Sequence, residues 1–162
     1  MMIFRQAAKE ERAFLFQEGY KEWSKARTFE QYCIDNSKDD TIGTRYVIEE
    51  HSQIVCSAVL MQLQSISGLA VYGLGSILTS QNYRGKGYGS ELIKRCINLV
   101  PNTNTIIFLY SDIHPSYYEK LGFQSLPAKL QKYEKSICMA YCQEPVWSVL
   151  VNANAADIPD YF

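Results

Sequence analysis

The spacing of hydrophobic residues divides the chain into helices and strands. In the N-terminal region, apolar side chains recur at helical spacing at Ala13, Phe16, Tyr20 and Trp23. Further along, alternation and short apolar runs predict strands. The predicted elements are, in chain order, a strand over 3–6, helices over 9–23 and 28–34, strands over 45–49, 54–64 and 69–79, a helix over 90–100, a strand over 105–110, a helix between Pro115 and Gly122, and strands over 123–126 and 136–142.

Breaks in this pattern add local detail. Polar residues over 35–40 predict a loop. Both alternating sets of side chains over 54–64 are mostly apolar, so we expect that strand to be buried on both faces. Gly73 and Gly75 lie inside the strand over 69–79 and predict a bulge or a close backbone approach.

The C-terminal part of the chain, 143–162, has a pattern of its own. Alternating residues at Trp147, Val149 and Val151 predict a further strand. We expect Trp147, Tyr161 and Phe162 to pack either on the body of the domain or on a second copy in a homodimer.

A glycine-rich stretch holds the strongest chemical signal. Residues 84–89 read Arg-Gly-Lys-Gly-Tyr-Gly, after a predicted strand and before a predicted helix. Glycines let several backbone N–H groups turn toward one point, and a helix N-terminus adds positive potential there. The stretch therefore predicts a binding site for a phosphate-bearing cofactor.

Two kinds of cofactor loop compete for this stretch. A dinucleotide-binding loop requires Gly-x-Gly-x-x-Gly, whereas the chain has Gly-x-Gly-x-Gly; Asp112 lies roughly 20 residues downstream, where such a fold places an acidic residue. The remaining chain is too short for two mononucleotide-binding halves. A Walker loop is excluded because no Gly-Lys-Ser or Gly-Lys-Thr ends the turn.

Two segments resemble one family. Residues 81–89 resemble the acetyl-CoA loop of the GNAT superfamily of N-acetyltransferases, with Arg84, Gly87 and Gly89 at the pattern positions, and residues 117–123 resemble the family's Phe-Tyr-x-x-x-Gly-Phe segment. The resemblance implies a mixed α/β fold with a mainly antiparallel central sheet of six to seven strands, about four helices and a splayed cleft for CoA. It also implies transfer of acetyl from acetyl-CoA to a primary amine, by direct attack in a ternary complex.

The resemblance assigns roles to particular residues. Main-chain groups of Ile77, Leu78 and Thr79 would pair with the pantetheine arm, which Ser111 would also contact. The pyrophosphate would lie on backbone N–H groups of the loop and the helix start, with positive charge from two of the side chains. The loop residues are Arg84, Gly85, Lys86, Gly87, Tyr88, Gly89 and Ser90.

Tyr118 is the predicted general acid. A phenol has a pKa of about 10, close to that of an alkyl thiol, so it suits proton donation to a departing CoA thiolate. Neighbouring Tyr117 faces another direction on a helix and is expected in the core or the wall of the site.

The general base and the acceptor are less defined. The strands over 69–79 and 105–110 contain no carboxylate, which leaves Glu49, Glu50, His51, Asp112 and His114 as candidates. We expect the first two helices to wall the acceptor, with Tyr20, Trp23 and Tyr32 in an aromatic pocket or in an ordinary core. Polyamines, antibiotics, amino acids and protein N-termini all stay open as acceptors. The alternative function is a non-catalytic module that binds CoA or a partner.

Composition narrows these expectations. The 162 residues suit a single domain, and the net charge of −1 argues against nucleic acid as a partner. No apolar run reaches the roughly 20 residues that span a bilayer, and no secretory hydrophobic region is recognisable, so we expect a cytoplasmic protein that contacts no membrane. Five cysteines without a Cys-x-x-Cys pair indicate neither a disulfide framework nor a metal site, and we expect them to act as small core hydrophobes.

Overall fold

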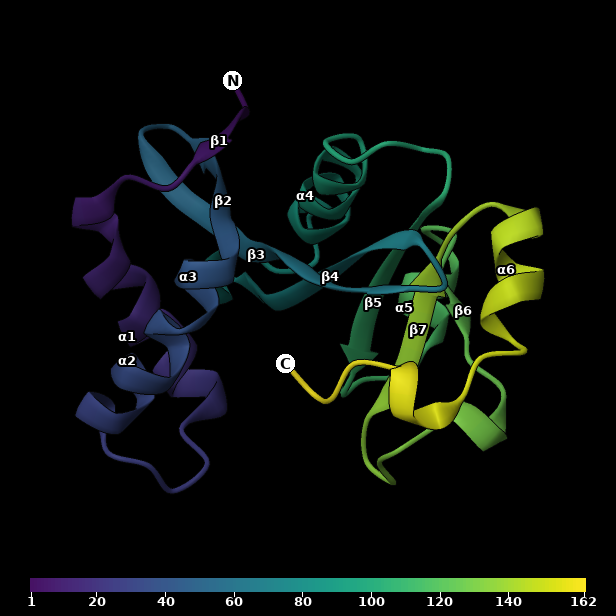
Figure 1. Cartoon of the computed structure of the whole chain (residues 1–162). Helices are drawn as coiled ribbons and strands as arrows, with labels where there is room; N and C mark the ends of the chain where they lie inside the picture. The colour runs from purple at the N-terminus through teal and green to yellow at the C-terminus, as the bar shows by residue number, and fades with distance from the viewer. The chain divides into compact units, whose positions relative to one another are not determined.

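A computed structural model describes residues 1–162 (Figure 1). Its helices and strands are β1 (Ile3–Gln6), α1 (Arg12–Trp23), α2 (Phe29–Ser37), α3 (Asp39–Ile42), β2 (Gly43–Glu50), β3 (Gln53–Ile66), β4 (Leu69–Thr79), α4 (Tyr88–Ile97), β5 (Thr105–Ser111), α5 (Ser116–Glu119), β6 (Gln124–Ser125), β7 (Ile137–Tyr141) and α6 (Glu144–Leu150). Short 3₁₀ turns lie at 9–11, 81–83, 128–130 and 155–157.

The strands form one seven-stranded sheet in the order β1-β2-β3-β4-β5-β7-β6. β4 and β5 pair in parallel, whereas the pairs β1–β2, β2–β3, β5–β7 and β6–β7 are antiparallel. The prediction of a mixed α/β fold with a mainly antiparallel sheet is therefore confirmed. A doubly wound parallel sheet is absent, so the dinucleotide-binding alternative is wrong.

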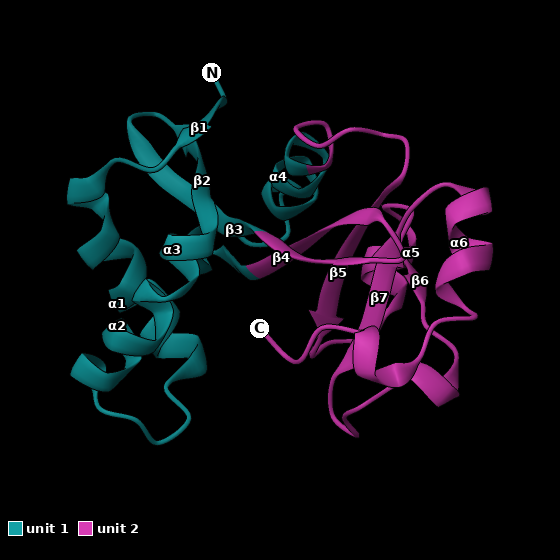
Figure 2. Cartoon of the chain, viewed as in Figure 1, with its two compact units in different colours: residues 1–61, 76–96 teal, residues 62–75, 97–162 magenta.

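The chain divides into two compact units (Figure 2). Unit 1 comprises residues 1–61 and 76–96, and unit 2 comprises residues 62–75 and 97–162. β3 and β4 each contribute residues to both units. The prediction of a single domain over 1–162 stays a prediction.

In unit 1, helical structure continues beyond the point that the sequence predicted. Thr28 begins α2 by accepting a hydrogen bond on its side chain from the Gln31 N–H. The predicted loop over 35–40 is wrong, because α2 extends to Ser37 and α3 follows. Asn36 and Ser37 donate their side-chain hydrogens to backbone carbonyls four residues earlier, so the helix accommodates these polar side chains.

Unit 2 is built around a buried cluster that includes Phe108, Leu126 and Leu150. The predicted strand around 147–151 is wrong, since 147–150 belong to α6 and Val151 caps its C-terminus. Val146 and Leu150 are four residues apart and both buried, which is helical spacing, and a proline in the first turn favours the helix start. Trp147 and Phe162 pack against the same cluster, which agrees with the expected packing on the body of the domain.

The middle of β4 carries an irregularity that bears on the site. The pairs between β4 and β5 run from Ala70–Thr105 to Gly73–Phe108, and the ladder ends there within unit 2. Ser76, further along β4, has a φ of 49°, which is unusual for a residue with a side chain. This backbone fits the bulge predicted from the glycines in the strand. In β3, the run from Val55 to Val59 is buried, as expected for a strand covered on both faces.

Candidate functional site

The glycine loop lies entirely in unit 1, between the end of β4 and the start of α4. The Ser80 N–H donates to the Val55 carbonyl at 2.9 Å, which extends the strand pairing up to the start of the loop. Gly85 and Gly87 have φ values of 75° and 85°. A Cβ at either position would meet no atom within 4 Å, so glycine is required here by the backbone conformation and not by crowding.

The loop leads directly into a helix N-terminus with unused donors. The Glu91 N–H donates to the Gly87 carbonyl at 3.1 Å and begins the hydrogen-bond pattern of α4. The N–H groups of Tyr88 and Gly89 precede this bond and have no acceptor within the helix. α4 is 10 residues long, so its dipole adds positive potential at the same end. These backbone groups can bind an anion.

The two cationic side chains of the loop are engaged with their own unit. Arg84 donates from Nε to the Thr79 carbonyl at 3.0 Å, and its guanidinium also pairs with Glu22 of α1. The Lys86 ammonium lies 5.7 Å from the centre of the Tyr83 ring. In this conformation Arg84 links the loop to the end of β4, and the backbone N–H groups are the ones available to bind an anion.

Two carboxylates of α1 support the loop from outside, and sequence reasoning missed both. Glu18 accepts a hydrogen bond from the Ser80 hydroxyl at 3.2 Å, and Glu22 pairs with Arg84. Glu18 and Glu22 are four residues apart and therefore lie on the same face of the helix. Their i, i+4 spacing is the sequence pattern that could have indicated a carboxylate-bearing face of α1.

A groove of about 1000 Å³ in unit 1 borders the loop and the end of β4. Leu78, Thr79 and Arg84 line it together with five glutamates of α1, the turn before it and β2. One of these glutamates is Glu49, a candidate base, whose carboxylate pairs with Arg5 at 2.8 Å. Arg5 also pairs with Glu11 at 2.7 Å. The charged lining is thus largely neutralised by its own ion pairs.

The other two candidate bases of unit 1 are Glu50 and His51. Glu50 accepts a hydrogen bond from the Tyr88 hydroxyl, which lowers the pKa of its carboxyl group below the ordinary value. His51 is exposed in the turn between β2 and β3, with a φ of 51°. The lowered pKa makes the Glu50 carboxylate a weaker base than an ordinary glutamate.

Tyr118 belongs to unit 2, where it lies in the four-residue helix α5. Its side chain is 8% exposed. Burial, with smaller effects of Tyr117 and Asp112, raises the pKa of the Tyr118 phenol to about 12.

The end of α5 explains the Gly-Phe signature. Gly122 has a φ of 98°, and the Phe123 N–H donates to the Tyr118 carbonyl at 3.2 Å, which closes the helix. The Phe123 ring lies 6.3 Å from the Tyr118 ring, edge to face. Tyr117 is 36% exposed, which excludes the core alternative, and its place in the wall of the site stays a prediction.

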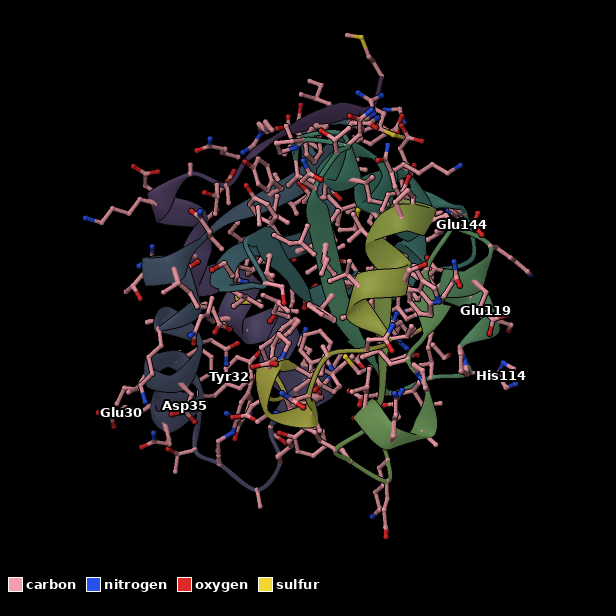
Figure 3. The ribbon with its side chains drawn as sticks, turned by 45° about the vertical axis from the view of Figure 1, so that its right-hand side comes forward. Glu30, Tyr32, Asp35, His114, Glu119 and Glu144 are labelled. Atoms are coloured by element: carbon pink, nitrogen blue, oxygen red, sulfur yellow. The ribbon has the colours of Figure 1, made fainter.

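Three predicted residues near α5 have partners within unit 2. Ser111 is buried and donates its hydroxyl hydrogen to the Ile113 carbonyl at 2.7 Å. Asp112 accepts hydrogen bonds from Ser136 and from Tyr161. His114 lies at the outer surface (Figure 3), where its Nδ1 accepts a hydrogen bond from the Ser116 N–H at the start of α5.

The aromatic residues predicted near an acceptor form a core. Tyr20 packs edge to face on Tyr32 at 5.6 Å, and its hydroxyl donates to the Arg27 carbonyl. Tyr32 is 3% exposed. A Cβ at Gly19 would lie 2.2 Å from the Tyr32 hydroxyl, so α1 and α2 meet closely here. The ordinary-core alternative therefore describes Tyr20 and Tyr32.

Two further observations concern other kinds of site. No helix combines the length and the apolar character needed to cross a membrane. No group of three or more His, Cys, Asp or Glu side chains is arranged to hold a metal ion.

Comparison with known proteins gave a family and several similar folds. The profile of the family described as Acetyltransferase (GNAT) domain matches residues 42–125. No curated protein sequence matches the chain. The protein PH1933 from Pyrococcus horikoshii OT3 is 17% identical, with a TM-score of 0.72 over 89% of this chain and 99% of that chain.

Two other solved structures carry informative names. A chimera of the spermidine N-acetyltransferase SpeG from Vibrio cholerae and hSSAT is 17% identical, with a TM-score of 0.64 over 91% of this chain and 98% of that chain. A GNAT family acetyltransferase from Brucella melitensis, solved with acetyl-CoA, is 19% identical, with a TM-score of 0.60 over 88% of this chain and 90% of that chain. At these identities the likeness shows the fold. The family profile, however, covers more than half of the chain and includes the glycine loop, and the chain therefore belongs to the GNAT family of acetyltransferases.

Proposed function

We propose that this protein is an N-acetyltransferase that transfers the acetyl group of acetyl-CoA to a primary amine. The observation that carries the proposal is the loop from Arg84 to Ser90, where two glycines with positive φ precede unused helix N–H groups inside the matched region. Acetyl-CoA supplies a pyrophosphate for this loop, and it is the ligand of the Brucella melitensis relative.

The pantetheine arm would bind along β4. The β4–β5 pairs end at Gly73 and Phe108, which leaves later backbone groups of β4 without that partner. Pantetheine contains amides that can pair with such an edge, and Ile77, Leu78 and Thr79 are the residues concerned. Arg84 acts on this binding indirectly, because it bonds the Thr79 carbonyl and sets the position of the strand end.

The chemical step requires proton transfer at the thiol. The amine nitrogen attacks the thioester carbonyl carbon, a C–N bond forms and the C–S bond breaks. The CoA sulfur leaves as a thiolate and takes the phenol proton of Tyr118, and the proton lost by the amine returns the phenol to its neutral form through solvent. The Tyr118 phenol holds its proton at neutral pH, since its ordinary pKa of about 10 already lies well above 7 and burial raises it to about 12.

The acceptor is proposed only as a class. The name of one relative specifies spermidine N-acetyltransferase, and spermidine contains primary amines.

All five cysteines are free thiols, which suits a reducing compartment such as the cytoplasm.

A panel of amines tests the proposal. Purified protein is incubated with acetyl-CoA and polyamines, amino acids, aminoglycosides or peptides, and each acetylated product is detected by mass spectrometry. We expect amine-dependent product with wild-type protein and far less with Tyr118→Phe. Tight binding of acetyl-CoA without product from any amine would favour the non-catalytic module instead.

A further inference from the structure

Residues 158–162, hereafter the C-terminal segment, are fastened to unit 2 at several points. The Tyr110 hydroxyl donates to the Pro159 carbonyl at 2.5 Å. The Lys132 ammonium donates to the Ile158 carbonyl at 2.6 Å and pairs with Asp160 at 3.1 Å. These contacts come from side chains of β5 and of the connection before β7, so the segment has a defined path.

Phe162 lies at a specific place on β4. A Cβ built on Gly73 would lie 2.9 Å from the Phe162 ring, so the ring packs directly on the backbone of this glycine. Gly73 is the last residue of β4 that pairs with β5. The C-terminal segment therefore lies beside the point where the two strands stop pairing.

Tyr161 connects the C-terminal segment to the chain that leads into α5. Its hydroxyl donates to a carboxylate oxygen of Asp112 at 2.7 Å. Asp112 follows β5 directly and begins the short connection, 112–115, that precedes α5. The other carboxylate oxygen of Asp112 accepts a hydrogen bond from Ser136, so the side chain is held from two directions.

This connection matters because α5 cannot hold its own position. A helix of four residues is too short to be stable by itself in water. Its N-terminal support comes from the connection itself, because the Ser116 N–H donates to Nδ1 of His114 at 3.2 Å. Burial raises the pKa of both the Tyr118 and the Tyr161 phenol, and the charge of Asp112 raises both further.

We propose that Tyr161 is a positioning residue, whose hydrogen bond to Asp112 orders the connection 112–115 and thereby fixes the hydroxyl of Tyr118 for proton donation. The inference rests on the proposed function, since it assigns Tyr161 a role through the general acid. It also makes a physical statement about the order of α5 that does not depend on catalysis.

The experiment compares Tyr161→Phe with Tyr133→Phe. Tyr133 is the matched control, because its hydroxyl accepts a hydrogen bond from the Tyr161 N–H at 3.0 Å and so contacts the same segment without touching Asp112. Amide hydrogen exchange of residues 112–121 is measured for each variant, together with kcat and the KM for acetyl-CoA on an amine accepted by the wild-type protein. Asp112→Asn and the double variant Asp112→Asn/Tyr161→Phe complete a cycle.

We expect Tyr161→Phe to speed exchange across 112–121 and to lower kcat about tenfold with the KM for acetyl-CoA within about twofold, whereas Tyr133→Phe changes neither. The kcat of the double variant should be no lower than that of the less active single variant, because both substitutions remove the same hydrogen bond. Unchanged exchange in Tyr161→Phe overturns the proposal whatever the activity, and faster exchange with unchanged kcat overturns the positioning role. If the wild-type protein acetylates no amine, the proposed function fails, and the exchange data alone decide whether Tyr161 orders α5.

Discussion

The guanidinium of Arg84 donates a hydrogen bond to the backbone carbonyl of Thr79 at 3.0 Å. This bond joins the two ends of the connection between β4 and the glycine loop. Thr79 is one of the residues proposed to pair with pantetheine, and Arg84 begins the stretch proposed to bind the pyrophosphate. A single side chain thus sets the spacing between two parts of one proposed cofactor site.

Replacement of Arg84 tests this coupling. Because a hydrogen bond from a charged donor is lost, we expect Arg84→Ala to raise the KM for acetyl-CoA about tenfold, with a smaller change in kcat. Arg95→Ala is the control, since Arg95 forms a similar pair with Glu91 on α4 without contacting the loop. Equal KM values for the two variants in steady-state kinetics would contradict the coupling.

Gly87 tests the need for a left-handed backbone in the loop. We expect Gly87→Ala to cost roughly 1–3 kcal/mol in backbone strain and to weaken acetyl-CoA binding, because its φ of 85° disfavours any side chain. Gly68 has a φ of 79° in the turn between β3 and β4, with equally open surroundings. Gly68→Ala should lose similar stability in urea unfolding but keep the KM for acetyl-CoA. Equal loss of binding in both variants would assign the effect to general destabilisation.

Tyr118→Phe tests the general acid. We expect kcat to fall about a hundredfold or more with little change in the KM for acetyl-CoA, because the lost proton is needed only as the thiolate leaves. Since the pKa of the Tyr118 phenol is raised to about 12, wild-type activity should show no loss through its deprotonation between about pH 7 and 10. Tyr117→Phe is the matched control, and a kcat for Tyr118→Phe equal to that of Tyr117→Phe would exclude Tyr118 from the chemistry.

Buried thiols predict how stability depends on pH. Burial raises the pKa of the Cys56, Cys96 and Cys138 thiols to about 12, from an ordinary value of 9.0. Their stabilising effect is complete below about pH 9 and is lost as pH rises toward 12, because the unfolded chain releases these protons first. Each thiol contributes a slope of up to roughly 1.4 kcal/mol per pH unit.

Urea unfolding at pH 7, 8, 9 and 10 in the presence of a reductant measures this effect. We expect the free energy of unfolding to decline beyond pH 9, and less steeply in Cys96→Ala than in the wild-type protein. A free energy that is constant up to pH 10, or an identical slope in the variant, would contradict the assignment to buried thiols.

The sequence predicted most of the fold because its signals were local. Strands with strong apolar character, such as β3 and β4, and the helix after the glycine loop appear where periodicity placed them. The errors came from polar residues with tertiary or helical partners. Asn36 and Ser37 were predicted in a loop, but their side chains bond to carbonyls of their own helix. The alternation near Val149 predicted a strand, whereas the buried residues of α6, Val146 and Leu150, have helical spacing.

The site was predictable where backbone conformation depends on residue type. Gly85, Gly87 and Gly122 have the positive φ that glycine tolerates, whereas Gly89 of the same stretch does not. The partners of side chains were not predictable, because they come from distant parts of the chain. Glu22 is 62 residues from Arg84, and Tyr161 is 49 residues from Asp112. A local sequence pattern cannot predict contacts between residues that far apart in the chain.

Calorimetric titration of the wild-type protein with CoA and, separately, with pantetheine tests the central claim most directly, because only CoA carries the diphosphate. If the backbone amides between residues 84 and 90 bind that diphosphate, CoA should bind at least about a hundredfold more tightly than pantetheine, and Gly87→Ala should remove most of the difference. Equal affinity for the two compounds, or no heat of binding with CoA at millimolar concentration, would contradict the claim.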